Sequence, residues 1–205
     1  MMTIHENDDR NLFDALPAID FDASKRLHIE LVSAAQREGL LDVAYRTMDT
    51  PVGELLLAGT ERGLVRVAFA GQGHDKVLAS LAATISPRIL RAPDRLDEVA
   101  RQIEQYFSGR RRTFDLPLDW RLSRGFRLNV LSHLPDIAYG RTASYAEVAA
   151  VAGSPRAVRA VGTACATNPL PVVVPCHRVV RSDGTSGGYV GGVEAKATLL
   201  NLEAA

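Results

Sequence analysis

Cysteine is scarce in this sequence. The 205 residues contain two cysteines, Cys165 and Cys176, and no pair with the spacing of a metal site or a redox motif. A disulfide framework and a structural zinc site are therefore not expected, and nothing in the sequence calls for another metal or a cofactor. No apolar run approaches the length of about 18 residues that a membrane span needs, and the first residues do not form a signal peptide. We expect a cytoplasmic protein without membrane contact, in which Cys176 stays reduced.

Net charge is also absent, since 24 basic residues balance 24 acidic ones. The balance hides an asymmetry: residues 121–205 hold nine basic and five acidic residues, which leaves −4 for residues 1–120. A basic C-terminal half fits a partner with a phosphate backbone, although a charge of +4 is weak evidence by itself.

The hydrophobic pattern divides the chain into three regions and predicts an α/β (α+β) fold. Residues 1–42 form an acidic N-terminal extension, in which residues 23–40 could form a helix with Leu27, Leu31, Ala34 and Ala35 on one face. We interpret it as a docked accessory helix, with a regulatory role as the alternative. Residues 43–120 form a small α/β domain, and residues 121–205 form a mostly helical domain.

The middle region reads as strands followed by helices. Apolar and β-branched residues predict an antiparallel three-stranded sheet from residues 41–48, 52–58 and 64–70, with turn residues at positions 60–63. Helical periodicity follows in residues 75–85 and 94–107. The connection to the last region lies in residues 109–117.

The C-terminal region contains a helix-turn-helix pattern. Ser144 and Glu147 have the spacing of a capping box, in which each side chain bonds the other residue's backbone N–H at a helix start. That helix should end at Gly153, and Ser154-Pro155 should begin the next one. The second helix carries small residues, which permit close approach to another surface; tight packing in a core is the structural alternative.

Cys176 and His177 stand side by side after the apolar run 172–174, within Pro175-Cys176-His177-Arg178. A thiol is only slightly ionised near neutral pH, so a nucleophilic cysteine needs a base or positive charge nearby. The pair alone could equally be a buried thiol beside a surface histidine. The flanking residues favour a functional pair.

These flanking residues resemble the O6-alkylguanine-DNA alkyltransferases, which are suicide DNA-repair proteins. The resemblance is carried by 168–180, by the glycine-rich stretch 182–192, by 196–203, and upstream by 139–140, 144–145 and 156–162. The segment 50–58 resembles the start of the family's N-terminal domain more weakly. Ala138 and Leu131 depart from the family pattern, at positions that look like packing positions.

The resemblance implies a single-turnover transfer of an alkyl group, methyl above all, from O6 of guanine, and also from O4 of thymine, to Cys176. His177 would act as the base through a water molecule, and Glu203 would orient the imidazole and stabilise its positive charge. Asn168 would brace the turn before the cysteine loop. The product would be a thioether, which water does not cleave, so each molecule would react once.

The target atom lies inside a duplex, so the damaged base would have to be flipped out. Arg159 would fill the space that the base leaves, and Tyr145 would push the target phosphate and hydrogen-bond the flipped base. The second helix would lie in the minor groove. The residues that the resemblance places against DNA are Arg159, Tyr145, Ser144, Ala157, Ala160 and Gly162.

The substrate pocket would be formed mainly by the glycine-rich loop. Tyr189 would wall it, and backbone groups of Cys176, Val179 and Val190 would read the guanine edge. The absence of side chains at Gly187 and Gly188 would leave room for alkyl groups, benzyl included. Cys165 has no base beside it and reads as inert packing near the pocket.

The expected partner is double-stranded DNA containing O6-alkylguanine. We expect a monomer in solution, with several copies able to bind along DNA. Two other classes compete. A binding module that recognises the lesion without repairing it would lack the cysteine, which Cys176 argues against. A Cys-His hydrolase is disfavoured by the helix-turn-helix beside the thiol and by the lack of a second substrate domain.

Overall fold

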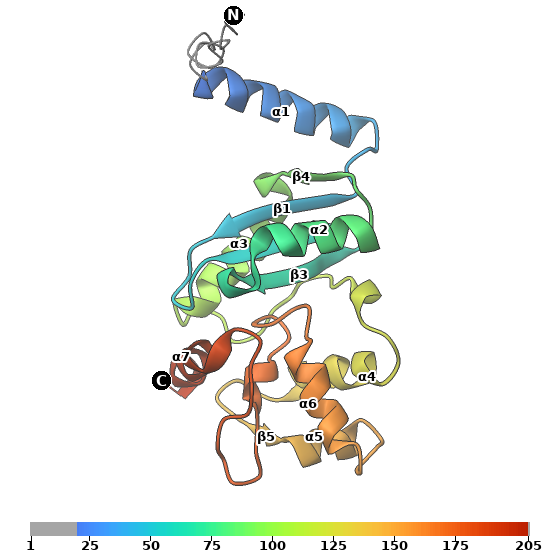
Figure 1. Cartoon of the computed structure of the whole chain (residues 1–205). Helices are drawn as coiled ribbons and strands as arrows, with labels where there is room; N and C mark the ends of the chain where they lie inside the picture. Colours follow the sequence, from blue (N-terminus) through green and yellow to red (C-terminus); the bar gives the residue numbers. More distant parts are fainter. Residues whose placement is uncertain (1–19, 205) are drawn as a thin grey trace, which may run out of the picture.

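The computed structural model describes residues 20–204, and Figure 1 shows an elongated molecule with three tiers. Helix α1 lies at one end, a sheet with its helices lies in the middle, and a helical part containing the C-terminus lies at the other end. The elements of the first two tiers are α1 (Phe21–Arg37), β1 (Val43–Met48), β2 (Leu55–Thr60), β3 (Gly63–Phe69), η2 (Ala70–Gln72), α2 (His74–Thr84), β4 (Ile89–Arg91), η3 (Pro93–Leu96) and α3 (Asp97–Phe107). Those of the third tier are η4 (Trp120–Leu122), α4 (Gly125–His133), η5 (Leu134–Asp136), β5 (Ala143–Ser144), α5 (Tyr145–Val151), α6 (Val158–Ala166), η6 (Cys176–Arg178), β6 (Val179–Val180) and α7 (Gly192–Ala204).

The main sheet has four strands in the order β3-β2-β1-β4. The three expected antiparallel strands are present, because β2 pairs antiparallel with both β1 and β3. The fourth strand, β4, was not expected; it pairs parallel with β1 at the edge. The three residues of β4 are too few to show a strand period in the sequence, so only their pairing with β1 defines the strand.

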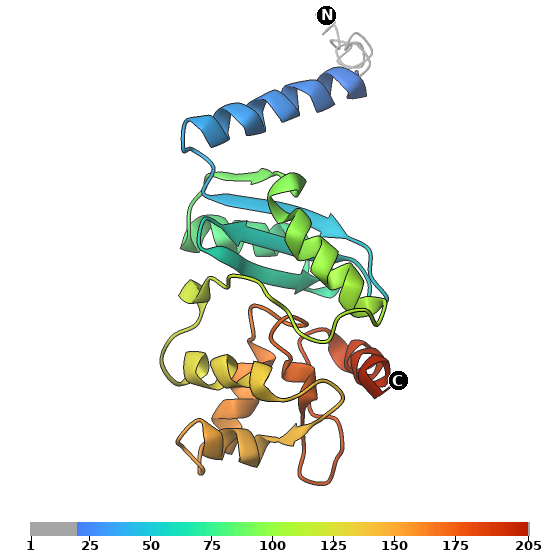
Figure 2. The same cartoon turned by 180° about the vertical axis from the view of Figure 1, so that it is seen from behind.

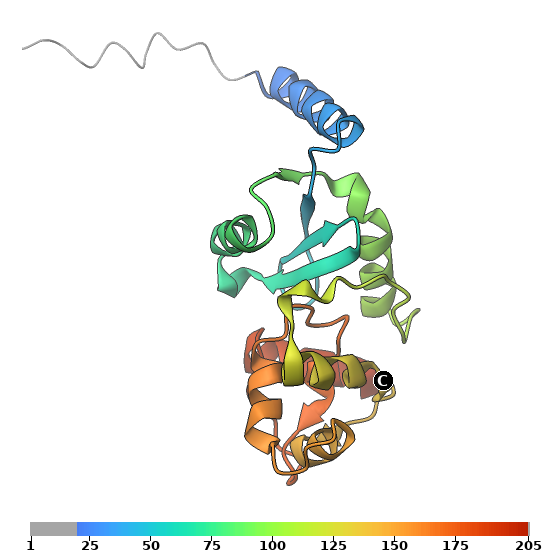
Figure 3. The ribbon, with the colours of Figure 1, turned by 90° about the vertical axis from the view of Figure 1, so that its right-hand side faces the viewer.

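Helices cover both faces of this sheet. Figure 3 shows the sheet nearly edge-on, with α2 on one side and α3 on the other, and Figure 2 shows α3 crossing the back. Leu55 and Leu57 of β2 pack on the α3 side with Ile103, whereas Leu56 packs on the α2 side with Val77. The alternation along β2 explains why the strand is apolar throughout: both faces are buried.

One hydrophobic core runs from the sheet into the helical part. It joins Leu57 and Ile103 to Val130 of α4, Val161 of α6 and Leu199 of α7, all of them buried. The loop before the cysteine also bonds the sheet, since Val67 N–H donates to the Pro169 carbonyl at 2.8 Å. The sheet is therefore a direct support of the cysteine loop.

The helix-turn-helix is present, with one correction. Ser144 Oγ accepts from Glu147 N–H at 3.2 Å and Glu147 Oε2 accepts from Ser144 N–H at 2.6 Å, so the capping box is confirmed. The expected start of the second helix at Ser154-Pro155 is wrong, because α6 begins at Val158. Residues 154–157 form a separate turn, closed by Ala157 N–H donating to the Ser154 carbonyl, and Ser154 caps no helix.

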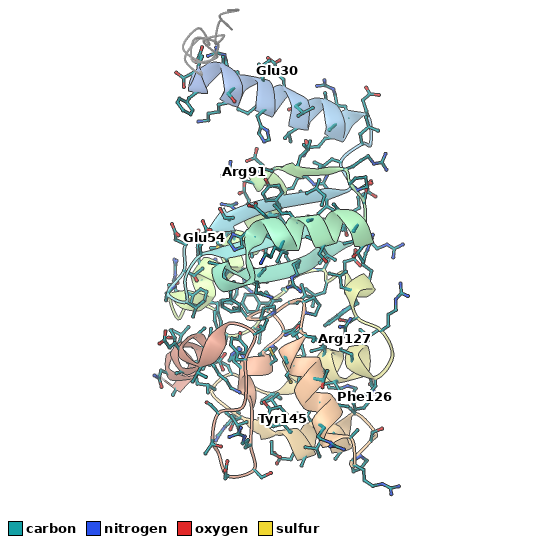
Figure 4. The ribbon with its side chains drawn as sticks, viewed as in Figure 1. Glu30, Glu54, Arg91, Phe126, Arg127 and Tyr145 are labelled. Carbon is teal, nitrogen blue, oxygen red and sulfur yellow. The ribbon has the colours of Figure 1, made fainter. Side chains whose placement is uncertain are left out.

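Helix α1 forms in the extension, as expected, with Asp20 as its N-cap. The expected apolar face was wrong for Leu27 and Leu31, which are 64% and 53% exposed. Docking instead uses Val32 and Ala35, which pack on the edge of the sheet, and His28, whose Nε2 bonds the Arg91 carbonyl. Figure 4 labels Arg91 below the helix.

Two further sequence features are placed by the structure. Leu131 is buried in the shared core, as a packing position should be, whereas Ala138 is exposed. Within residues 20–204, none of the helices is long and apolar enough to cross a membrane.

Candidate active site

The cysteine loop follows α6 and is held by Asn168. The Asn168 Nδ2 donates to the Val174 carbonyl at 2.9 Å and to Cys176 Sγ at 3.1 Å, while its Oδ1 accepts from Leu170 N–H at 2.9 Å. Between them Val172 has a φ of 73°, a conformation that β-branched residues rarely adopt. A side chain that bonds both ends of the loop and the sulfur can hold such a backbone in place.

The Cys176 thiol is only 2% exposed. Burial raises its pKa to about 11, although the Asn168 hydrogen bond and the positive charge of Lys196 act in the opposite direction. At neutral pH the resting group is therefore a protonated thiol. A reaction that uses the thiolate needs a base in the same site.

His177 and Glu203 form the expected pair. The His177 Nε2 lies 2.9 Å from Glu203 Oε1, and both side chains are buried. Because an ionised carboxylate only accepts hydrogen bonds, Nε2 carries the ring proton and Nδ1 carries the lone pair. Nδ1 is buried and has no hydrogen-bond partner among residues 20–204, so it is free to accept a proton.

The His177 ring is neutral at rest. Burial lowers its pKa, and the hydrogen bond and negative charge of Glu203 oppose that effect without overcoming it. The positive charges of Arg178 and Lys196 lower the pKa further. A neutral imidazole with a free Nδ1 is a competent proton acceptor.

Glu203 is the most heavily hydrogen-bonded carboxylate of the site. Arg178 donates to both of its oxygens at 2.8 Å, Tyr106 Oη donates to Oε1 at 2.7 Å, and Gly140 N–H donates to Oε2 at 3.2 Å. Burial alone would raise the pKa of Glu203, but the hydrogen bonds from His177 and Arg178 outweigh it and hold the pKa at about 2. The resemblance segment 139–140 contributes here, since Tyr139 Oη also bonds the Leu202 carbonyl.

Lys196 is a fully buried cation beside the loop. Its Nζ donates to the Val179 carbonyl at 2.6 Å, and burial lowers its pKa. Val179 also pairs with Ala143, which links the cysteine loop to the start of α5. Lys196 thus fixes the segment that follows the cysteine.

Sequence reasoning missed Lys196 and Tyr106 and gave Arg178 no specific role. The residues next to Lys196 in the sequence give no sign that its side chain is buried. Tyr106 lies 71 positions before His177, on α3, and no pattern in the sequence relates the two. For Arg178 the sequence suggests only a structural ion pair or a phosphate contact, and the structure contains the ion pair, with Glu203.

Tyr145 and the glycine-rich loop lie together. A Cβ built on the buried Gly187 would collide with the Tyr145 hydroxyl, while a Cβ on Gly188 would meet nothing within 4 Å. The two glycines are therefore not equivalent. Tyr145 stands at the first turn of α5, and Figure 4 labels it in the helical part.

Tyr189 and Val190 are half-buried, and the sheet supports their loop. The rings of Tyr189 and Phe69 meet edge to face at 5.7 Å, and a Cβ on Gly191 would approach the Phe69 ring to 2.6 Å. Tyr189 also lies edge to face with His177, at 6.3 Å. The residue expected as the pocket wall thus lies beside His177.

Half of the residues expected at DNA lie on α6, and Ala157 directly precedes this helix. Arg159 and Ala160 are exposed, and Ala157 and Gly162 are partly exposed. In the part of the chain that the structure describes, Arg159 makes no ion pair. Ser144 is engaged in its capping box instead of standing free.

Cys165 lies on the inner face of α6 and is buried. Burial is the main cause that raises the pKa of this thiol well above its usual range. Residues 20–204 contain no group of three or more His, Cys, Asp or Glu side chains that could hold a metal ion. Of the two cysteines, Cys176 is the one that a buried histidine directly follows.

Two sequence profiles match most of the chain. Residues 125–205 match the DNA-binding domain of 6-O-methylguanine DNA methyltransferase, and residues 43–120 match its ribonuclease-like domain. The chain belongs to the 6-O-methylguanine DNA methyltransferase family. The resemblance seen in the sequence is confirmed, as is the α/β fold class.

Relatives named methylated-DNA–protein-cysteine methyltransferase align along most of their length. The one from Methanosarcina barkeri is 40% identical over 159 residues, which is 78% of this chain and 96% of the relative. A constitutive one from Bacillus subtilis is 42% identical over 160 residues, 78% of this chain and 94% of the relative. Residues before the matched region, α1 included, lie outside the family profiles.

Solved structures agree with these matches. The crystal structure of the Mycobacterium tuberculosis O6-methylguanine methyltransferase superposes with a TM-score of 0.68 at 37% identity, covering 79% of this chain and 93% of that one. The OGT of the same organism in complex with DNA gives a TM-score of 0.68 at 37% identity, covering 78% and 92%.

Proposed function

We propose that this protein repairs DNA by transferring an alkyl group from O6 of guanine to the Sγ of Cys176. The observation that carries the proposal is the arrangement of Cys176 beside His177 and Glu203, in a chain that belongs to a family of methylated-DNA–protein-cysteine methyltransferases. The neutral His177 with a free Nδ1 supplies the base that the buried thiol needs.

The transfer balances without a cofactor. His177 Nδ1 takes the thiol proton, through a bridging water molecule because no direct hydrogen bond joins the two side chains. The thiolate then attacks the alkyl carbon, the S–C bond forms and the C–O6 bond breaks. The released guanine takes up one proton at N1, which balances the proton lost by the thiol.

The reaction stops after one event. A thioether on Cys176 is not activated, and a thiolate is too poor a leaving group from an alkyl carbon for water to displace it. The protein is consumed as a reagent, in contrast to an acyl-enzyme, which water hydrolyses.

Duplex DNA is the partner, and we propose that the exposed face of α6 enters its minor groove. Small residues on this face support close approach, and Arg159 is free of ion pairs within residues 20–204 and can fill the stack after base flipping. The position of Tyr145 against Gly187 supports a contact with the flipped base. O4 of thymine is a second substrate in this proposal.

The wider organisation is also proposed. An extension (1–42) precedes an α/β domain (43–120) and a catalytic, DNA-binding domain (121–205). The protein acts as a monomer that can bind DNA in several copies. A cytoplasmic, reducing setting suits a reaction that needs a free thiol at Cys176.

Intact mass spectrometry after incubation with an O6-methylguanine duplex tests the proposal. We expect a permanent gain of one methylene per molecule in the wild-type protein, and none in Cys176→Ala, which should still bind the duplex. Methyl transfer to Cys165 in that variant would contradict the assignment of Cys176 as the nucleophile. Binding without a mass change in the wild type would favour a lesion-recognition module. The absence of both binding and a mass change would favour a hydrolase.

A further inference from the structure

Tyr106 brings a hydroxyl from the sheet-bearing half of the molecule into the active site. It lies near the end of α3, and Figure 2 shows this end of α3 close to α7. The side chain is fully buried, and its Oη donates to Glu203 Oε1 at 2.7 Å. Tyr106 Oη also lies 3.4 Å from His177 Nε2.

The hydroxyl completes a crowded set of donors on one carboxylate. Oε1 of Glu203 accepts from Tyr106, His177 and Arg178, and Oε2 accepts from Arg178 and Gly140. Five donors thus share the roughly four lone-pair directions that a carboxylate offers. The carboxylate cannot turn away from His177 without breaking another bond.

The Tyr106 ring cannot move easily either. It packs against Phe107 and Phe114, each at 5.3 Å, and edge to face against Tyr139 at 6.2 Å. Burial, and then the charge and hydrogen bond of Glu203, raise the pKa of its phenol far above the ordinary value. Tyr106 therefore remains a donor at every working pH.

Donation by Tyr106 weakens the support that Glu203 gives to a positive His177. Part of the negative charge on Oε1 is taken up by the phenol, and Arg178 neutralises the carboxylate from the other side. The ring keeps its hydrogen bond to Glu203, while the positive charge of Arg178 offsets part of the negative charge of that carboxylate. Both effects favour the neutral imidazole that can accept a proton.

We propose that Tyr106 is a positioning residue for the alkyl transfer: through Glu203 it fixes His177 with Nδ1 as the basic nitrogen and keeps the ring neutral before the reaction. The inference rests on the proposed function of Cys176. It makes the middle tier of the fold a part of the active site as well as its support.

The groups around His177 show what a pH profile would report. Glu203 and Lys196 come from α7, Cys176 and Arg178 from η6, Tyr106 from α3 and Tyr189 from the glycine-rich loop. The pKa of Glu203 is about 2, that of Cys176 is about 11, and burial raises that of Tyr189. Glu203 titrates far below the measured range, so we assign the acid limb of the profile to His177, whose pKa burial lowers.

Tyr106→Phe tests the proposal because it removes the hydroxyl and keeps the ring. The single-turnover rate of methyl transfer is measured against pH, between roughly 5 and 9, for the wild type and the variant. We expect the acid limb of the variant to move upward by roughly half to one pH unit, and its plateau to fall about ten-fold, the size of one hydrogen bond to a charged group. Tyr45→Phe, on β1 and outside the site, is the matched control and should behave as the wild type.

NMR titration of the His177 ring, without DNA, gives an independent readout. Its midpoint should rise in Tyr106→Phe and fall when 3-fluorotyrosine, a stronger donor, replaces Tyr106. An unchanged midpoint and acid limb would overturn the inference, even if the plateau fell, because lost packing alone would leave both in place. If Tyr106→Phe did not fold, the fluorotyrosine protein would decide. If the wild-type protein transferred no methyl group, the proposed function would be wrong. The titration of the His177 ring would still test whether Tyr106 lowers the pKa of His177.

Discussion

Arg178 binds Glu203 through two parallel hydrogen bonds, Nε to Oε2 and Nη2 to Oε1, each of 2.8 Å. Both side chains are buried, so the pair is a desolvated ion pair beside His177. Its geometry is the bidentate fork that makes arginine–carboxylate pairs specific. Arg178 thus shares with His177 the carboxylate that the histidine needs for its orientation.

Breaking this pair on one side should destabilise the protein strongly. Arg178→Met leaves Glu203 with a buried charge and fewer donors, so we expect the free energy of unfolding to fall by about 3 kcal/mol or more. The free energies of unfolding are measured by urea denaturation. The double variant Arg178→Met/Glu203→Gln should lose less than the sum of the two single variants, because it leaves neither charge alone. Additive losses would show that the two residues act independently.

The pH dependence of the free energy of unfolding should show that the Glu203 carboxylate is ionised in the folded protein. Its pKa is about 2 in the folded protein and 4.5 as an ordinary value, so its stabilisation is present above about pH 4.5 and is lost as the pH falls toward 2. The gap in unfolding free energy between wild type and Glu203→Gln should therefore narrow over this range, by roughly 2–3 kcal/mol at most. A gap that stays constant from neutral pH to pH 2 would contradict the ionised Glu203.

Some of the fold was predictable because local chemistry determines it. Ser144 and Glu147 satisfy each other's N–H groups within one turn, and the apolar run of β2 predicts a buried strand. The start of α6 was not predictable from Ser154-Pro155, since the same residues also suit the turn that the chain makes. The burial of α1 depends on which face meets the sheet, and its sequence offers more than one apolar stripe.

The site also contains residues that could be predicted from the sequence and residues that could not. Cys176, His177, Asn168 and Glu203 could be named from the sequence because the family resemblance covers them. Tyr106 could not, because its role depends on a contact between α3 and α7 across 97 positions. Burial of Lys196 was equally hidden, since a buried lysine follows from packing around it and not from its neighbours in sequence.

Arg159 should matter for duplex DNA and not for the free base. Its side chain is exposed on α6, and a free base such as O6-benzylguanine needs no extrusion from a stack. We expect Arg159→Ala to slow repair of an O6-methylguanine duplex at least about ten-fold and to leave the single-turnover reaction with O6-benzylguanine close to wild type. Equal losses on both substrates would assign Arg159 to the stability of α6 instead.

Gly187 and Gly188 offer a matched pair of variants one residue apart. Neither glycine has a positive φ, so alanine introduces no backbone strain at either position. Its Cβ would collide with the Tyr145 hydroxyl at Gly187 and would meet open space at Gly188. We expect Gly187→Ala to displace Tyr145 or the loop and to slow duplex repair by about ten-fold or more, whereas Gly188→Ala should remain near the wild type.

The measurement is the second-order rate on O6-methylguanine and O6-benzylguanine in the same oligonucleotide. If the loop sets the width of the pocket, the wild type accepts both groups, and the bulkier Gly188→Trp lowers the benzyl rate more than the methyl rate. Gly187→Ala should lower both, because it disturbs Tyr145 and not the space for the alkyl group. Equal rates for Gly187→Ala and Gly188→Ala would show that the contact between Gly187 and Tyr145 does not position the hydroxyl. A benzyl rate unchanged in Gly188→Trp would mean that another surface limits the alkyl group.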